Sequence, residues 1–261
     1  MKKILLLLMA FLFSAITWNV FAQDPIFTKI ETANLKKELQ QNNKNPEKLV
    51  ELIRQSIESK QIEVAYQTLN EMRLTQPNNA VVLAAYAMAY DASLYQVRKR
   101  TGVIRSRTPQ EKREYESTLK KAKQLSPKLW LPYTIEGFRL AYTPPWKYDE
   151  GLDLLHKAIQ LAPRAAFAHK QFAQALNLAA NNKRKWQEKT VTHEQAAAQY
   201  EIAYKLNPNS ADVAFALFTV YDIDLKDKRK ATQAKRAFLK TLPPNYNLSK
   251  SVRERLAQYP D

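Results

Sequence analysis

Histidine is the first residue type to consider for chemistry, because its imidazole serves as a general base and as a metal ligand near neutral pH. The chain has three histidines, His156, His169 and His193, and none has a second histidine or a carboxylate at metal-ligand spacing. The motif H-E-x-x-H does not occur. His169 occupies an apolar position of a predicted helix, so we expect it to be buried or half-buried, whereas His193 should be exposed. The histidines therefore predict neither a metal site nor a catalytic base.

Carboxylates are the second candidates for acid–base chemistry. Asp222 and Asp224 lie two residues apart at a predicted helix end. This spacing points them to different sides, whereas a catalytic pair must converge. The chain also lacks cysteine, a G-x-S-x-G elbow, an S-x-x-K motif and a Walker loop. It has three glycines, where average usage predicts about 18, which argues against Gly-rich phosphate loops. We predict no catalytic residue, no cofactor and no metal.

Positive charge is the most unusual property of the sequence. Its 261 residues include 41 Lys and Arg against 25 Asp and Glu, a formal net charge of +16. Lys2 and Lys3 belong to the extreme N-terminus, and the remaining +14 resides in three segments: 98–113, 181–190 and 226–236 carry +6, +3 and +5. The cations that we assign to this basic group are Arg98, Lys99, Arg100, Arg105, Arg107, Lys183, Arg184, Lys185, Lys228, Arg229 and Lys230.

The basic group has two interpretations. Charge runs of this kind often form a solvated face without a specific role. Alternatively, they form an electrostatic edge that attracts an anionic partner, with an attraction that weakens as salt rises. No nucleic-acid-binding motif accompanies the charges. The expected partners of such an edge are an acidic protein, an anionic envelope polymer or lipid head groups, rather than nucleic acid.

An internal repeat predicts the elements that position these residues. Segments ending at Pro77, Pro127, Pro163 and Pro208 place a small or modest residue, a large apolar residue four positions later, a helix-compatible residue three later and a proline five later. A weaker version ends at Pro243. Each of the first four prolines is followed by a set of residues that starts at Leu83, Tyr133, His169 or Ala214 and continues three, four and seven positions later, which puts the apolar members on one helical face. Each unit is therefore predicted to be two helices that end at a proline stop.

This small–aromatic–small–proline order over 34 residues resembles the signature of the tetratricopeptide repeat (TPR) family. The signature tryptophan is replaced here by Leu49, Leu83, Tyr133, His169 and Ala214. The resemblance implies an all-α fold, a right-handed superhelical solenoid of about five antiparallel helix pairs. We predict repeats at 46–79, 80–129, 130–165, 166–210 and 211–245, between an N-terminal segment at 23–45 with a short helix and a C-terminal capping helix and tail at 246–261.

The spacing of the prolines predicts where the basic segments lie. Successive prolines are 50, 36, 45 and 35 residues apart, so the 34-residue unit gains 16, 2, 11 and 1 residues. The flanks keep their internal spacing, which places the extra residues between the two helices of a unit. Thr108 with Glu111, and Thr192 with Gln195, fit capping boxes, so we expect a helix to restart there and part of the insertions to be helical. In a stack of helix pairs these turns emerge on one edge.

The resemblance also implies a groove, lined by the first helix of each repeat, that holds a peptide or protein segment. Lys170, Gln174 and Asn177 could hydrogen-bond an extended backbone or a terminal carboxylate. Family members that clamp carboxylates use Lys and Asn in adjacent repeats, and this chain lacks them there. For the phenylalanines, the alternative interpretation is packing against neighbouring helices. The proposed groove residues are Phe138, Phe167, Lys170, Gln174, Asn177 and Phe215, with Arg54, Asp91 and Asp222 among further residues expected on the same faces.

The N-terminus predicts export. Two lysines precede an apolar run from Ile4 to Phe13, and Val20-Phe21-Ala22 precedes Gln23. A basic start, a short apolar core and small residues before a cut are typical of a secretory signal peptide at 1–22. The alternative is an uncleaved anchor, for which the apolar run is short, since crossing a bilayer takes about 20 residues. We expect a bacterial exported protein, periplasmic if the source has an outer membrane and otherwise secreted.

Together these patterns predict a non-catalytic scaffold that binds a protein or peptide partner in the cell envelope. The alternative function is binding of an anionic envelope polymer or a membrane surface through the basic edge.

Overall fold

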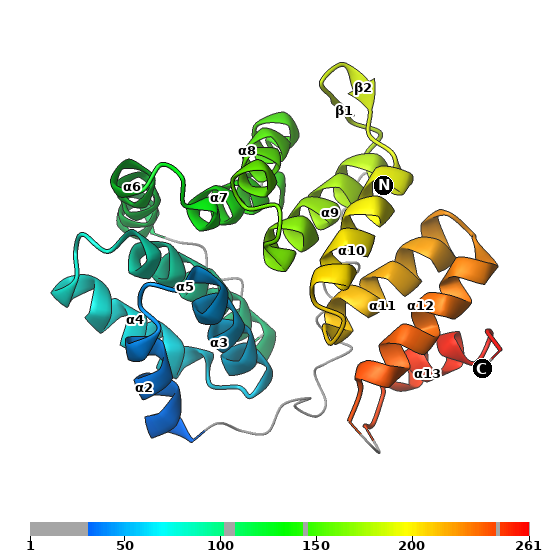
Figure 1. Cartoon of the computed structure of the whole chain (residues 1–261), viewed down its shortest axis with the longest axis horizontal. Coiled ribbons are helices and arrows are strands. Elements are labelled where there is room, and N and C mark those ends of the chain that lie inside the picture. The colour runs from blue at the N-terminus through cyan, green and yellow to red at the C-terminus, as the bar shows by residue number, and fades with distance from the viewer. Residues whose placement is uncertain (1–30, 102–107, 143–145, 244–245, 261) are drawn as a thin grey trace. The chain divides into compact units, whose positions relative to one another are not determined.

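The computed structural model describes residues 31–101, 108–142, 146–243 and 246–260, and for residues 95–101 it describes the helix alone. Within these ranges the chain consists of helices joined by short turns, with one small hairpin (Figure 1). Two compact units are present. Of the described residues, those of 31–139 and Leu154–Pro163 form the N-terminal unit, and those of Leu140–Asp153 and 164–260 form the C-terminal unit.

The helices are distributed over both units. The N-terminal unit holds α2 (Thr32–Gln41), α3 (Pro46–Glu58), α4 (Ile62–Thr75), α5 (Ala80–Thr101) and α6 (Pro109–Leu125). Two helices, α7 (Trp130–Tyr142) and α8 (Tyr148–Leu161), contribute residues to both units. The C-terminal unit holds α9 (Ala166–Asn181), β1 (Lys185–Trp186), β2 (Lys189–Thr190), α10 (His193–Leu206), α11 (Ala211–Thr219), the π-helical turn η1 (Val220–Asp224), α12 (Lys228–Thr241) and α13 (Lys250–Leu256).

Both predicted capping boxes are confirmed. The Thr108 hydroxyl accepts a hydrogen bond from the backbone N–H of Glu111, whose carboxylate accepts one from the N–H of Thr108. Thr192 and Gln195 make the same reciprocal pair at the start of α10. These caps satisfy N–H groups that the first turn of a helix leaves without partners, so they fix the residue at which each helix begins.

The two long insertions have different structures. In the first, α5 extends to Thr101, so part of the insertion is helical as expected. In the second, α9 ends at Asn181 and the chain forms an antiparallel hairpin in which Trp186 pairs with Lys189. The expectation of longer helix is therefore wrong for the second insertion. The hairpin is the only departure from an all-α fold among the described residues.

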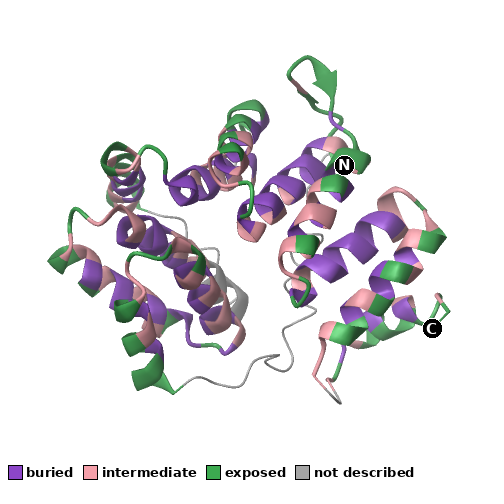
Figure 2. Cartoon of the chain, in the orientation of Figure 1, coloured by how far each residue is buried: buried purple, intermediate pink, exposed green. Residues whose placement is uncertain are grey.

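Buried alanines allow the paired helices to pack closely. Ala65, Ala122, Ala173, Ala203 and Ala231 come from different helices, and all are fully inaccessible to solvent. Figure 2 shows buried residues along the facing sides of the helices and exposed residues on their outer sides. A side chain without atoms beyond Cβ lets two helix axes approach, and larger side chains on the partner helix fill the space. The repeated small residues of the sequence therefore mark helix–helix contacts.

Aromatic side chains fill the core of the N-terminal unit. The rings of Tyr66 and Tyr86 lie 5.7 Å apart, and those of Tyr90 and Tyr115 lie 6.2 Å apart. The guanidinium of Arg73 lies 4.3 Å from the centre of the Tyr86 ring. These contacts connect α4, α5 and α6, and they place the large residues of the repeat against the second helix of the same or the preceding pair.

The core of the C-terminal unit is centred on α11. The ring of Phe215 lies 5.1 Å from that of Phe238 on α12 and 6.0 Å from that of Phe218. The apolar face expected for the last helix, Leu248, Val252 and Leu256, is buried against the same cluster. The chain end therefore covers a helix pair that would otherwise expose apolar surface.

Replacing Phe215 by alanine tests its place in this core. We expect Phe215→Ala to lower the free energy of unfolding by about 3–5 kcal/mol, because it removes a buried ring and leaves a cavity. Denaturant titration followed by circular dichroism measures the change. Leu239→Ala, at a residue of α12 that is 38% exposed, is the matched control and should change stability by less than about 0.5 kcal/mol. Equal effects of the two substitutions would contradict the assignment.

Candidate binding site

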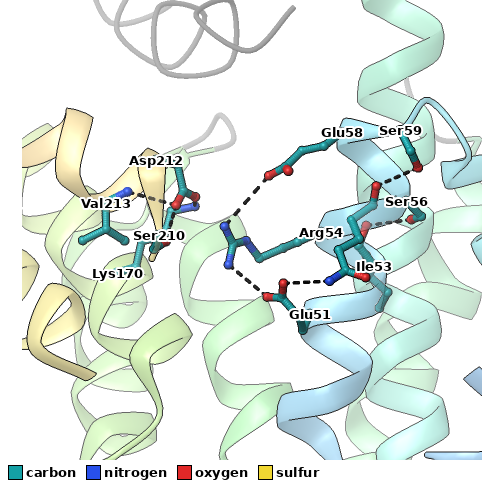
Figure 3. Close-up of polar contacts among 11 residues, drawn as sticks. Glu51, Ile53, Arg54, Ser56, Glu58, Ser59, Lys170, Ser210, Asp212 and Val213 are labelled. Atoms are coloured by element: carbon teal, nitrogen blue, oxygen red, sulfur yellow. Dashed lines mark hydrogen bonds and ion pairs between the residues drawn. The ribbon is translucent and has the colours of Figure 1, made fainter. Parts of the chain in front are cut away.

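Lys170, Gln174 and Asn177 lie on one face of α9, as their spacing requires. Lys170 does not present a free charge there, because its ammonium group pairs with the carboxylate of Asp212 at the start of α11 (Figure 3). The two side chains are only 12% and 14% exposed. Asp212 also accepts hydrogen bonds from the Ser210 hydroxyl and from the backbone N–H of Val213. Lys170 therefore connects α9 to α11, the first helices of two successive predicted repeats.

Asn177 is likewise engaged within the protein. Its side-chain oxygen lies 2.7 Å from Nδ1 of His193, and its side chain hydrogen-bonds the carboxylate of Asp224. An amide oxygen only accepts and an amide nitrogen only donates. The arrangement in which both bonds form therefore places a proton on Nδ1 of His193. Three segments meet here: the end of α9, the start of α10 and the turn η1.

Asp224 is the most perturbed carboxyl of this cluster. Burial raises its pKa, opposed by the nearby His193, Asn177 and Arg255, and Asp222 raises the pKa further. The Asp224 side chain is 6% exposed, and its Oδ2 lies 3.9 Å from Nδ1 of His193. Among the described residues this oxygen has no hydrogen-bond donor. The site therefore holds a carboxylate in surroundings that favour its neutral form.

The neighbouring Asp222 faces a different set of partners. Its carboxylate pairs with Arg255 of α13 and accepts a hydrogen bond from the Tyr259 hydroxyl. Burial, followed by the bond to Asp222, raises the pKa of Tyr259 to about 12. Asp222 and Asp224 thus have different hydrogen-bond partners, although Asp222 and Arg255 both affect the pKa of Asp224.

The three phenylalanines proposed for the groove have different environments. Phe215 is 1% exposed within the core cluster, so its assignment to an open groove is wrong and the packing interpretation applies. Phe138 and Phe167 are both partly exposed. Gln174 is partly exposed as well, and its backbone carbonyl accepts a hydrogen bond from the Tyr142 hydroxyl at 3.3 Å. Unlike those of Lys170 and Asn177, the side chain of Gln174 has no hydrogen-bond partner among the residues that the structure describes.

Polar residues expected on the inner faces of the N-terminal unit are also paired. Arg54 lies 3.2 Å from the carboxylate of Glu51 and 3.9 Å from that of Glu58 (Figure 3). Asp91 accepts a hydrogen bond from the Tyr115 hydroxyl. Trp130 at the start of α7 donates to the carboxylate of Glu47 at the start of α3, at 3.2 Å. In this unit Arg54 is therefore paired with carboxylates of its own helix, whereas Asp91 and Trp130 have partners on neighbouring helices.

The cations of the hairpin differ from these paired residues. Lys183, Lys185 and Lys189 are exposed, and within the described part of the chain none has a carboxylate within 4.0 Å. The guanidinium of Arg184 lies 5.3 Å from the centre of the Tyr148 ring. Trp186 donates to the carboxylate of Asp153 at 2.8 Å. The hairpin is therefore anchored through Trp186 and Arg184, with Lys189 on the same face as Trp186 and Lys185 on the opposite face.

The start of α12 adds further positive charge to the same unit. Lys228 and Arg229 are exposed, whereas Lys230 lies 3.8 Å from Glu201 and 4.9 Å from the Tyr221 ring centre. Of the first basic segment, Arg105 and Arg107 lie outside the described residues, and so do the side chains of Arg98, Lys99 and Arg100. The gathering of all three segments on one edge therefore stays a prediction.

Two histidine environments bear on the sequence predictions. His169 is 6% exposed, as expected, and its Nδ1 lies 2.8 Å from the side-chain oxygen of Gln199. His193 is half-buried rather than exposed, because Asn177 and Asp224 lie beside it. Sequence spacing missed the contacts of Asp212, His193 and Asp224, since each partner is in another helix. The one sequence feature that could have indicated the contact with Lys170 was the position of Asp212 in the first turn of the helix after Pro208.

Metal-binding clusters are absent from the described part of the chain, which contains no group of three or more His, Asp or Glu side chains that could hold an ion. None of the described helices combines the length and the apolarity needed to cross a bilayer.

Comparison with known proteins identifies the fold. No protein-family model and no curated protein sequence matches the chain. Among solved structures, TTC0263, a thermophilic TPR protein of Thermus thermophilus, is 15% identical, with 83% of this chain and 97% of that chain covered and a TM-score of 0.54. A MamA RS-1 double mutant is 15% identical over 76% of this chain and 94% of that chain, with a TM-score of 0.44. YrrB, described as a TPR protein with an unusual peptide-binding site, is 14% identical over 82% and 95%, with a TM-score of 0.41. The likeness to TTC0263 confirms an all-α helical-repeat fold of the TPR type.

Removing the charge of Asp224 should increase stability at neutral pH. The raised pKa means that the folded protein holds this proton more tightly than the unfolded chain, so ionisation of Asp224 costs stability above its folded pKa. We expect Asp224→Asn to raise the free energy of unfolding at about pH 7, with the gain shrinking as pH falls through the folded pKa and vanishing below the unfolded one. Denaturant titrations between about pH 3 and pH 8 measure this dependence.

Asp222→Asn is the matched control for that experiment. It removes the partner of Arg255 and should destabilise the protein at neutral pH. If Asp224→Asn also destabilised the protein near pH 7, its carboxylate would be contributing favourable contacts that outweigh burial.

Proposed function

We propose that this protein is a non-catalytic scaffold that binds a protein or peptide partner. The observation that carries the proposal is the repeated helix-pair fold, which it shares with TTC0263 over most of both chains. Stacked helix pairs create extended surfaces on which a partner segment can lie. The hydrogen bond between His193 and Asn177 and the ion pair between Asp222 and Arg255 support a structural role for these polar residues.

The proposed contact surface is the face of α9 that carries Lys170, Gln174 and Asn177, here called its inner face. Lys170 and Asn177 flank Gln174, and their pairing with Asp212 and with His193 holds them in fixed positions. A partner therefore meets a neutral, preorganised surface rather than a free lysine. The amide of Gln174 has both a donor and an acceptor for an extended backbone. This arrangement favours recognition of a peptide backbone over capture of a terminal carboxylate.

A pair of matched arginine substitutions tests this surface. The protein is immobilised, exposed to cell-envelope extract at low and high salt, and its retained partner is identified by mass spectrometry. Gln174→Arg should abolish retention, because a long charged side chain would obstruct the inner face, whereas Gln233→Arg at an exposed position of α12 should not. Retention that survives Gln174→Arg would place the partner elsewhere on the protein.

A second candidate function is binding of an anionic envelope polymer or a membrane surface. The unpaired lysines of the hairpin and the exposed start of α12 support it. Such binding should weaken steeply as salt rises, whereas backbone recognition at Gln174 should be almost insensitive to salt. The salt dependence of retention therefore separates the two functions.

The proposed setting is outside the cytoplasm, on the basis of residues 1–22. Protein recovered from the source cell should begin at Gln23, because Val20-Phe21-Ala22 fits a signal-peptidase site. Intact-mass measurement of the recovered protein checks this start, and cell fractionation checks the compartment. An intact mass that includes Met1–Ala22 would instead favour a retained anchor.

A further inference from the structure

We propose that the basic hairpin, residues 182–191, is a docking element for an acidic segment of a protein partner. The inference deepens the scaffold function proposed above by naming the chemistry of the partner, and it rests on that function. Charge complementarity, the anchoring of the hairpin and its unusual turn are the three observations behind it.

The lysines of the hairpin differ from the paired cations described above in having no carboxylate partner in the described part of the chain. Lys170 has a carboxylate partner, whereas Lys183, Lys185 and Lys189 have none within 4.0 Å among the described residues. An unpaired surface cation attracts carboxylates over about 8–10 Å at moderate salt, and a bound carboxylate need not displace an existing ion pair. The hairpin is therefore better suited to an anionic partner than the inner face of α9.

The anchoring of the hairpin keeps these cations in fixed positions. The indole of Trp186 donates to Asp153, and its ring meets the Phe172 ring edge-on at 5.5 Å. The backbone N–H of Arg184 donates to the carbonyl of Ala179 at 2.9 Å, and its carbonyl accepts from Val191 at 2.9 Å. A preorganised loop loses less conformational entropy on binding than a free one. The hairpin therefore has a docked base and a projecting tip.

The turn at the tip has an uncommon backbone. Gln187 and Glu188, between the two strands, have φ values of 49° and 62°. A two-residue hairpin turn of this kind favours Asn-Gly, because residues other than glycine are disfavoured in this region. Strained backbone persists where surrounding contacts hold it, which here are the Trp186 anchor and the strand pairing. The strain points to a shape that is maintained for the display of its side chains.

The hairpin fits an extended acidic polypeptide better than a bilayer. Lys185 pairs with Thr190 across the strands, on the face opposite Trp186, so its side chain points away from the docked side. Trp186 is anchored inward, which leaves no apolar side chain on the tip to insert into lipid. Lys185 and Lys189 lie on opposite faces of the two-residue strands, so an acidic segment that runs along the hairpin meets a cation on each face.

Two triple variants of equal charge separate this site from general electrostatic attraction. A fluorescent poly-glutamate peptide and vesicles containing phosphatidylglycerol are titrated with the purified protein at low salt. Lys183→Gln, Lys185→Gln and Lys189→Gln together should weaken peptide binding by about tenfold, from three exposed contacts of about 0.5 kcal/mol each. The control triple at Lys36, Lys37 and Lys44, exposed residues of the N-terminal unit, should weaken it less than about threefold.

A further variant tests the role of anchoring with every cation kept. Trp186→Ala removes the contacts to Asp153 and Phe172, and it should weaken peptide binding several-fold while helical circular dichroism stays unchanged. Unchanged affinity in Trp186→Ala would contradict a preorganised site.

The outcomes that overturn the proposal are distinct. Equal losses in the two triple variants would mean that net charge alone drives binding, and binding to vesicles without binding to peptide would mean a membrane partner. Absence of peptide binding by the unmodified protein would also reject it. If the partner retained through Gln174 still bound the hairpin triple variant, this inference would fail while the scaffold function stood. If no envelope partner were retained by the protein or its variants while peptide binding still depended on the hairpin lysines, the scaffold function proposed for α9 would fail and this inference would stand.

Discussion

Close packing between helices, made possible by fully buried alanines, is the constraint on which the rest of the structure depends. Ala122, Ala173 and Ala203 bring neighbouring helices together, and rings such as Phe215 and Tyr115 fill the remaining space. Substituting a larger side chain at one of these alanines would separate two helices rather than fill a cavity. The positions of all polar side chains between the helices follow from this spacing.

That spacing explains why polar side chains between the helices have partners within the protein. Helices held this close bring Lys170 into contact with Asp212, and Asn177 into contact with His193, although the partners are far apart in the sequence. A charge buried between helices requires a partner, and each unit supplies one. The described hairpin is under no such requirement, because the side chains of Lys183, Lys185 and Lys189 are exposed. The unpaired positive charge of this hairpin therefore lies outside the helix–helix contacts.

Local sequence patterns predicted much of the fold. Helix starts at Thr108 and Thr192 and the buried face at Val252 and Leu256 depend on residues three or four apart, and each was predicted correctly. The spacing of prolines likewise placed the insertions between helices. These features depend on local hydrogen bonds and on helical periodicity, which a sequence records directly.

The candidate site was less predictable, because its contacts are not local. Phe215 has the spacing of a groove residue but packs on Phe238, more than twenty positions away. The hairpin at Trp186 lacks a glycine in its turn, so no turn signal indicated it.

The separation between helix framework and insertions has a consequence for how such a protein can diverge. Residues of the hairpin contact the framework through a few anchors, chiefly Trp186 and Arg184. Substitutions at its tip should therefore disturb folding less than substitutions at the buried alanines, so the loop can be exchanged while the helices are kept.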